Sequence, residues 1–108
     1  MTDIRLLYVT TPDEETARRI AEALVEEHLA ACVNILAPMR SVYRWEGVIE
    51  DSVETPMIVK TSAAKAATAR DRVLELHPYE TPAIIALDVE AGASAPAFLQ
   101  WIEDETRG

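Results

Sequence analysis

The middle of the chain contains two strand patterns in succession with no helix between them, and this restricts the fold more than any other feature. The first arm consists of "AACVNIL" and "SVYRW", separated at Pro38, and the second is "VIEDSVETPMIVKT". Glu46–Gly47 between them predicts a tight turn. Pro56 predicts an edge or a bulge, because proline has no N–H for the ladder. The pattern predicts a long hairpin from about Ala31 to Thr61.

A strand and a helix precede the hairpin. "IRLLYVTT" (Ile4–Thr11) is almost continuously apolar, which is typical of a buried strand. "TPDE" predicts a helix start, with Thr11 as the cap, Pro12 in the first turn and Glu14 completing a capping box. Apolar residues at helical spacing then predict one buried face, formed by Ala17, Ile20, Ala21, Leu24 and Val25.

A second helix, a fourth strand and a terminal helix follow the hairpin. The helix is expected to begin at a Ser62 cap and to end before Pro78, because the residue before a proline avoids helical geometry. Its apolar residues are Val73, Leu74 and Leu76, and "AIIALDV" then predicts a core strand. "ASAPAFLQWIEDET" predicts a last helix with Pro96 in its first turn, packing through Phe98, Leu99, Trp101 and Ile102.

The order of elements is therefore β-α-β-β-α-β followed by one helix. Two βαβ-like halves around a central hairpin predict an α+β, ferredoxin-like βαββαβ sandwich with a long central hairpin and an extra C-terminal helix. The 108 residues fit one domain, residues 1–108. A compact domain of this length has a radius of gyration of about 13 Å.

The hairpin is too long for such a sheet. The first and last strands have eight residues or fewer, whereas an arm of about fourteen residues at ~3.3 Å per residue reaches well past them. Tyr43, Trp45, Val48 and Ile49 lie near its tip. Apolar side chains that project so far need a cover, which in a small domain is usually another subunit. We therefore expect a homo-oligomer.

The charge balance is acidic, with nineteen Asp and Glu against ten Lys and Arg and a formal net charge of −9. Phosphate backbones and anionic lipids would be repelled, so we expect no nucleic acid and no membrane as partner, and cations are favoured. The same acidity is also explained by solubility alone. One cysteine permits no intramolecular disulfide, and the chain opens without a signal-peptide pattern, which together predict a cytoplasmic protein.

The familiar enzyme motifs are missing: there is no glycine-rich phosphate loop, H-E-x-x-H, C-x-x-C or G-x-S-x-G. His28 and Cys32 are four residues apart and would align as metal ligands on one helix, but the change to a strand near Leu29 separates them. Cys32 then fits a small core residue, and His28 suits the C-terminus of its helix.

The segment "HPYETP", His77 to Pro82, combines a histidine, a tyrosine and a glutamate between two prolines. On one interpretation it is only a connector, with His77 capping helix carbonyls and Glu80 facing water. On the other it is the rim of a site, in which the prolines hold the His77 and Glu80 side chains at a subunit cleft with Tyr79 packed behind them. An acid–base pair of His77 and Glu80 in a small hydrolase or isomerase is a further alternative.

Several segments together resemble the CutA family of divalent-cation tolerance proteins. They are "TTPDEETAR", "AACVNI", "SVYRWEGVIE", "ETPMIVKT", "HPYETPAII" and "FLQWIEDET", and they extend from about Val9 to Thr106. The ordered set A-A-C, Y-x-W-x-G, K-T and H-P-Y-E-x-P is specific. The resemblance implies a ferredoxin-like fold, a tight homotrimer in which strands of neighbouring subunits pair, and a role connected with copper and other divalent cations.

The resemblance also assigns residues. His77 matches the family histidine associated with copper, and Cys32 matches the cysteine of A-A-C. Val9 and Leu76 stand where a copper-binding member has a cysteine and a second histidine, and Ala83 replaces a frequent glutamate. The candidate metal ligands are therefore His77, Glu80 and Cys32. Cleft or structural roles fall to the motif residues Tyr43, Trp45, Lys60 and Tyr79.

The leading functional hypothesis is a trimeric CutA-like protein that binds Cu²⁺ or another divalent cation weakly and is not an enzyme. The rival is a signalling trimer of the nitrogen-regulatory type, which binds a nucleotide or small anion between subunits. Such a protein needs basic residues at its clefts, and this chain has only two lysines, Lys60 and Lys65.

Overall fold

The computed structural model describes residues 2–107, whose elements follow the predicted order. They are β1 (Ile4–Thr11), α1 (Glu14–Glu26), β2 (Cys32–Ile35), β3 (Met39–Trp45), β4 (Val48–Ser62), α2 (Ala63–Leu76), β5 (Ile84–Asp88), the short 3₁₀ helix η1 (Ala91–Ala93) and α3 (Pro96–Glu105). The α+β, ferredoxin-like prediction is confirmed. Residues 1 and 108 of the predicted domain lie outside the described part, and its extent remains a prediction.

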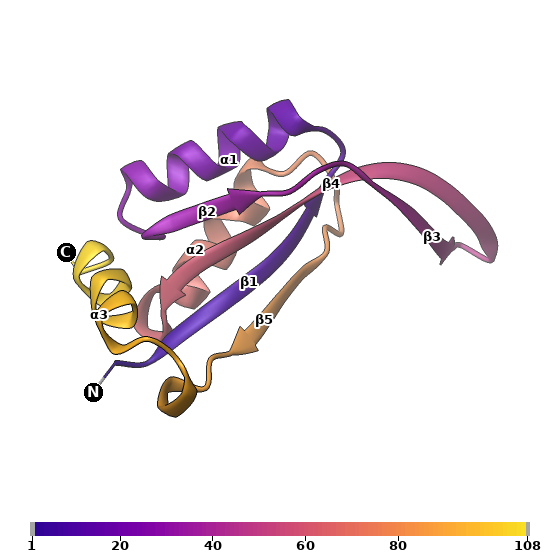
Figure 1. Cartoon of the computed structure of the whole chain (residues 1–108). Helices are drawn as coiled ribbons and strands as arrows, with labels where there is room; N and C mark the ends of the chain where they lie inside the picture. The colour runs from indigo at the N-terminus through magenta and orange to yellow at the C-terminus, as the bar shows by residue number, and fades with distance from the viewer. Residues whose placement is uncertain (1, 108) are drawn as a thin grey trace.

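All neighbouring strands are antiparallel, in the order β2-β4-β1-β5, and β3 pairs with the outer part of β4. β2 and β3 together form the first arm of the predicted hairpin, and β4, fifteen residues long, is the second. The inner half of β4 lies between β1 and β2. Its outer half pairs with β3 alone, and this pair of strands extends away from the rest of the molecule (Figure 1).

The hairpin turns and bends where its sequence predicts. Glu46 and Gly47 have φ angles of 50° and 79°, as a two-residue turn with both central residues left-handed requires. Pro56 lies opposite the gap between β2 and β3, because Ile35 pairs with Met57 and Met39 pairs with Glu54. Its carbonyl accepts a hydrogen bond from Leu36 N–H at 2.9 Å. The missing proline N–H therefore falls where the ladder is already interrupted.

Helices α1 and α2 cover one face of the sheet. The core beneath them is apolar and draws on both helices and on the two central strands: Leu7, Val9, Ala17, Ile20, Leu24, Leu29, Ala30, Met57, Val59, Ala69 and Val73. Val25 was predicted to be buried with this face of α1, but it is exposed, because the buried stripe of α1 ends at Leu24. Leu74 of α2 is exposed as well.

Two helix starts differ from the sequence prediction. Asp13, not Thr11, is the cap of α1, and its carboxylate accepts a hydrogen bond from Thr16 N–H at 2.7 Å. Thr11 still belongs to β1, and its buried hydroxyl donates to the Thr55 carbonyl at 2.8 Å. Ser62 does occupy the cap position of α2, but its side chain makes no capping hydrogen bond. In both places the strand continues further than the capping motif suggests.

The other face of the sheet is open apart from α3 at one end. Strand alternation places Leu6, Tyr8, Ile58, Ile85 and Leu87 on this open face, which we call the open sheet face. The strand β5 was expected in the core, but it is an edge strand, with Ile85 and Leu87 exposed.

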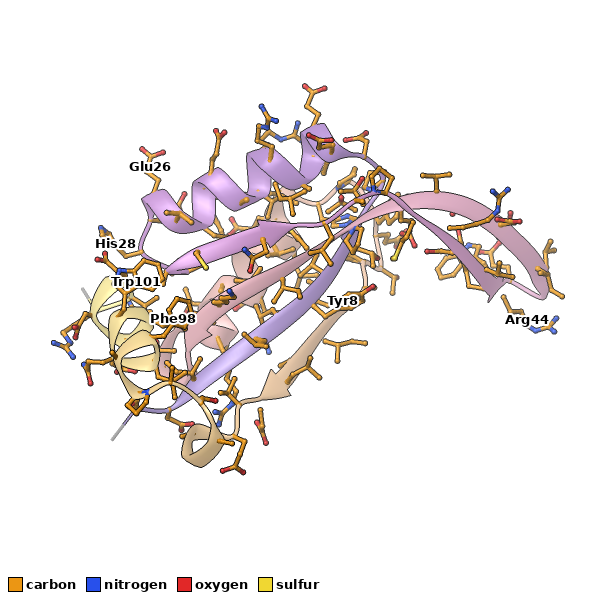
Figure 2. The ribbon with its side chains drawn as sticks, in the orientation of Figure 1. Tyr8, Glu26, His28, Arg44, Phe98 and Trp101 are labelled. Atoms are coloured by element: carbon orange, nitrogen blue, oxygen red, sulfur yellow. The ribbon has the colours of Figure 1, made fainter. Side chains whose placement is uncertain are left out.

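The helix α3 closes one end of the sheet. Leu99 and Ile102 pack against Ile4 and Ala31, as expected for two of its four predicted packing residues. Phe98 and Trp101 were expected to be buried too, but both are exposed. Their rings lie 5.5 Å apart, and the Lys60 ammonium lies 5.2 Å from the centre of the Phe98 ring at the edge of the open sheet face (Figure 2).

Candidate functional site

A pocket of about 650 Å³ lies between one face of the β3–β4 hairpin and the loop "HPYETP". Three aromatic side chains and two carboxylates line it: Tyr43 and Trp45 from β3, Glu54 from β4, and Tyr79 and Glu80 from the loop. The remaining wall consists of Thr10, Pro78, Thr81 and Ala83. The pocket therefore brings together four of the seven residues singled out from the sequence.

His77 fixes this loop to the sheet. Its ring is 6 % exposed, and its backbone N–H donates to the Val73 carbonyl at the end of α2 at 2.8 Å. Nε2 lies 2.8 Å from the Thr10 carbonyl, and Nδ1 lies 3.1 Å from the backbone N–H of Tyr79. A carbonyl accepts and an N–H donates, so the ring is neutral with its proton on Nε2. His77 therefore connects α2, β1 and the loop, but its ring bonds to Thr10 of β1 and not to the helix carbonyls that the connector interpretation expected. A site rim at the same segment stays a prediction.

Metal binding by His77 requires a change in this arrangement. A metal needs the lone pair of a neutral ring nitrogen, and the lone pair on Nδ1 already accepts the Tyr79 N–H. Coordination through Nδ1 would replace that hydrogen bond, and coordination through Nε2 would replace the bond to Thr10. A copper ion at His77 thus competes with the hydrogen bonds that hold the loop.

Tyr79 was expected to pack behind His77 and Glu80. Its ring does contact His77, with the ring centres 4.9 Å apart, but its other side faces the pocket. Burial raises the pKa of its phenol, and the charge of Glu54 and the nearby Tyr43 and Asp13 raise it further. The phenol therefore remains protonated and neutral at physiological pH.

Glu54 is the pocket residue that sequence reasoning missed. The register pairs Tyr43 with Glu50 and Met39 with Glu54, so Glu54 lies on the same face of the hairpin as Tyr43. This relation was available from the sequence, because a two-residue turn at Glu46–Gly47 fixes the pairing of every residue beyond it. Counting residues from this turn along the second arm would have placed Glu54 on the same face as Tyr43.

Cys32 and Lys60 lie away from the pocket. They are paired across β2 and β4, whereas Thr10, which His77 contacts, is paired with Pro56. The separation of four positions along β4 corresponds to ~13 Å. Cys32 is the first residue of β2 and is half-buried, not a mid-strand core residue. The structure thus does not gather His77, Glu80 and Cys32 into one cluster.

Val9 and Leu76, which stand where a copper-binding family member has ligands, cannot supply a metal ligand either. Val9 is fully buried in the core, and Leu76 packs against the same core. Across residues 2–107 there is no group of three or more His, Cys, Asp or Glu side chains placed to hold a metal ion. The pocket itself offers the two carboxylates of Glu54 and Glu80.

His28 contacts the C-terminus of a different helix from the one predicted. It adopts a φ of 60° just after α1, and its Nδ1 lies 3.0 Å from the Glu105 carbonyl at the end of α3. Because the carbonyl accepts, Nδ1 carries the proton. His28 thus serves a helix C-terminus as expected, but that of α3 instead of its own helix, and it lies beside the last turn of α3 in Figure 2.

The antiparallel sheet is backed by two helices and extended by a projecting hairpin, and an acidic aromatic pocket lies against that hairpin. These features define a ferredoxin-like α+β protein with a ligand-sized pocket. The family model described as "CutA1 divalent ion tolerance protein" matches residues 5–105, and the chain belongs to this family. The predicted membership is confirmed. Within the part of the chain that the structure covers, no helix has the length and apolar character needed to cross a membrane.

Individual relatives agree with this assignment. The divalent-cation tolerance protein CutA of Archaeoglobus fulgidus is 48 % identical over 98 residues, which cover 91 % of this chain and 93 % of the relative. The structure of CutA1 from Ehrlichia chaffeensis matches with a TM-score of 0.91 at 41 % identity, covering 100 % of this chain and 99 % of that one. The structure of a periplasmic divalent cation tolerance protein CutA from A. fulgidus matches with a TM-score of 0.91 at 44 % identity, covering 96 % and 99 %.

Proposed function

We propose that this chain is a cytoplasmic, metal-binding homotrimer without catalytic activity, which contributes to tolerance of divalent cations, copper in particular. The observation that carries the proposal is the pocket between the hairpin and the loop after α2. Glu54 and Glu80 face it, and the lining residues that the structure describes include no lysine or arginine. Cations are therefore favoured there, and the nucleotide or anion of the rival nitrogen-regulatory hypothesis is disfavoured.

The cation is bound weakly, by the carboxylates of Glu54 and Glu80. His77 would join them only after a rearrangement of the loop in which its Nδ1 exchanges the Tyr79 N–H for the metal, because residues 2–107 hold no ready group of three such ligands. Oxygen and nitrogen ligands bind Cu²⁺ more tightly than Zn²⁺ in the general order of divalent ions. Two factors support a low affinity: the ligand set in one chain is small, and His77 must give up a hydrogen bond. Cys32 contributes only as a separate thiol site, because it lies far from the pocket.

The apolar surface of the chain supports the homotrimer. Exposed apolar residues include Ile85 and Leu87 of the open sheet face, Phe98 and Trp101 on α3, and the hairpin residues Val42, Val48, Ile49 and Val53. The accessible surface is 6605 Å², whereas a compact monomer of this mass exposes about 6,000 Å². Pairing with other copies of the chain would cover both the apolar face and the free edges of the hairpin.

Calorimetric titration with CuCl₂, ZnCl₂, ATP and ADP tests the proposal. We expect Cu²⁺ to bind more tightly than Zn²⁺ and neither nucleotide to bind. The double variant Glu54→Gln/Glu80→Gln should lose most copper affinity, and Cys32→Ser should retain it. Copper affinity should also fall as the pH is lowered, because protons compete with the metal for its ligands.

The role of His77 is tested separately with His77→Ala, after thermal unfolding has shown that the variant is folded at the titration temperature. Reduced copper affinity would support its place among the ligands. Unchanged affinity would leave it as a connector only. Loss of copper binding in Cys32→Ser alone would move the site to β2, and tight binding of ATP would favour the signalling trimer.

A further inference from the structure

The three aromatic rings of the pocket have no part in metal binding. Divalent metals bind through oxygen, nitrogen and sulfur atoms, and Trp and Tyr rings offer no such donor from their faces. Tyr43, Trp45 and Tyr79 nevertheless come from two separate segments, and their side chains remain 43 %, 51 % and 45 % exposed around one cavity. Three aromatic rings next to two carboxylates therefore indicate a ligand other than a metal ion.

Aromatic rings and carboxylates together suit an organic cation. An alkylated ammonium group spreads its charge over its C–H groups and is weakly hydrated, so it gains from contact with the negative faces of aromatic rings. Trp is the strongest of these partners, and carboxylates supply the balancing charge. Inorganic divalent ions hold their water tightly and gain little from such walls.

The size of the pocket agrees with this chemistry. A volume of about 650 Å³ lies within the usual range of roughly 300–1,000 Å³ for small-molecule sites. The lining offers two carboxylates, from Glu54 and Glu80, and no basic side chain among its described residues. Tyr79 also keeps its proton, because burial and the nearby Glu54 raise its pKa, so the phenol does not add a competing charge.

We propose that the pocket formed by Tyr43, Trp45, Tyr79, Glu54 and Glu80 binds a small organic cation with an alkylated ammonium group. Trp45 from β3 and Tyr79 from the loop after α2 both line the pocket, and the two glutamates would neutralise the charge. The proposal does not depend on metal binding, because it assigns the rings a role that coordination does not use.

Calorimetric titration with choline and with 3,3-dimethyl-1-butanol tests the proposal, since the two molecules have the same shape and only choline is charged. We expect choline to bind at least about tenfold more tightly than the alcohol. Trp45→Leu and Tyr79→Leu should each weaken choline binding at least about fivefold. The matched control is Trp101→Leu, which removes an exposed tryptophan of α3 outside the pocket and should leave choline affinity unchanged.

Equal affinity for choline and the alcohol, no binding of either, or unchanged choline affinity in both aromatic variants would each overturn the proposal. If Trp45→Leu does not fold, Tyr79→Leu and Glu54→Gln decide the question on their own. Copper titration of the same variants separates this proposal from the metal function. Tyr79→Leu should weaken choline binding at least about fivefold and leave copper binding unchanged, whereas Glu54→Gln/Glu80→Gln should weaken the binding of both.

Discussion

The imidazole of His77 joins three segments: the end of α2, the end of β1 and the loop that leads to β5. We expect His77→Ala to be strongly destabilising, because it leaves the Thr10 carbonyl and the Tyr79 N–H without their side-chain partner. Each buried polar group left unpaired costs about 1–3 kcal/mol. Urea unfolding should show the loss. The exposed neighbour, in Glu80→Gln, is the control, and an equal midpoint for both variants would contradict the structural role of the ring.

The capping carboxylate of Asp13 should make the stability of the folded protein depend on pH in the acidic range. The hydrogen bond from Thr16 N–H lowers the pKa of its carboxyl below the ordinary value. A group with a lowered folded-state pKa contributes stability above its ordinary pKa and loses it as the pH falls through the lowered value. We therefore expect Asp13→Asn to flatten the decline in thermal stability below about pH 4. Glu15→Gln, on the exposed surface of α1, should leave the decline unchanged.

Sequence reasoning named four of the residues that line the pocket, although their role there stays a prediction: Tyr43 and Trp45 through the family motifs, and Tyr79 and Glu80 in the segment between two prolines. It misplaced the cap at Thr11, because the motif "TPDE" contains two competing caps. The extra pairing of Thr11 with Thr55 decides between them, and that partner lies 44 residues away.

The hairpin turn contains a non-glycine residue in the left-handed conformation. Glu46 adopts a φ of 50°, a conformation that costs most residues about 1 kcal/mol or more and that asparagine tolerates better. We expect Glu46→Asn to stabilise the hairpin by up to about 1 kcal/mol, since Asn-Gly is the preferred pair for this turn. Chemical denaturation measures the change. Glu50→Asn, which replaces a glutamate within β4 instead of in the turn, should not stabilise and serves as the comparison.

At the level of elements, the order of strands and helices and the long hairpin were predictable because they follow from periodicity and turn residues. The exposure of β5 and of Phe98 and Trp101 was not. An apolar strand has the same sequence pattern whether its own chain or a second chain buries it. The sequence pattern alone therefore does not tell which of these apolar surfaces a single copy of the chain leaves exposed.

The whole molecule is less compact than its length suggests. Its radius of gyration is 14.5 Å, and its extents are 45 × 28 × 22 Å, in contrast with the ~13 Å radius of a compact domain. The hairpin that projects in Figure 1 accounts for the difference. A shape of this kind supports assembly, as does the open sheet face.

We expect a mass near three chains in gel filtration coupled to light scattering at micromolar concentration. Ile85→Lys should shift the protein to smaller species, because a charge on the open sheet face prevents its burial against another copy. Leu74→Lys, on the exposed side of α2, should keep the mass of the wild type. A monomer for the wild-type chain would overturn the proposed homotrimer.

The outer half of β4 has a partner strand on one side only, from Val48 to Glu54. Every second backbone amide there points away from β3 and, in a lone chain, exchanges its hydrogen with solvent freely. Deuterium uptake along this one strand would therefore alternate between protected and unprotected positions. If a neighbouring strand pairs with the free side, the alternation disappears on assembly, and dilution restores it. A single strand of this protein can thus report, amide by amide, whether a second chain is bound.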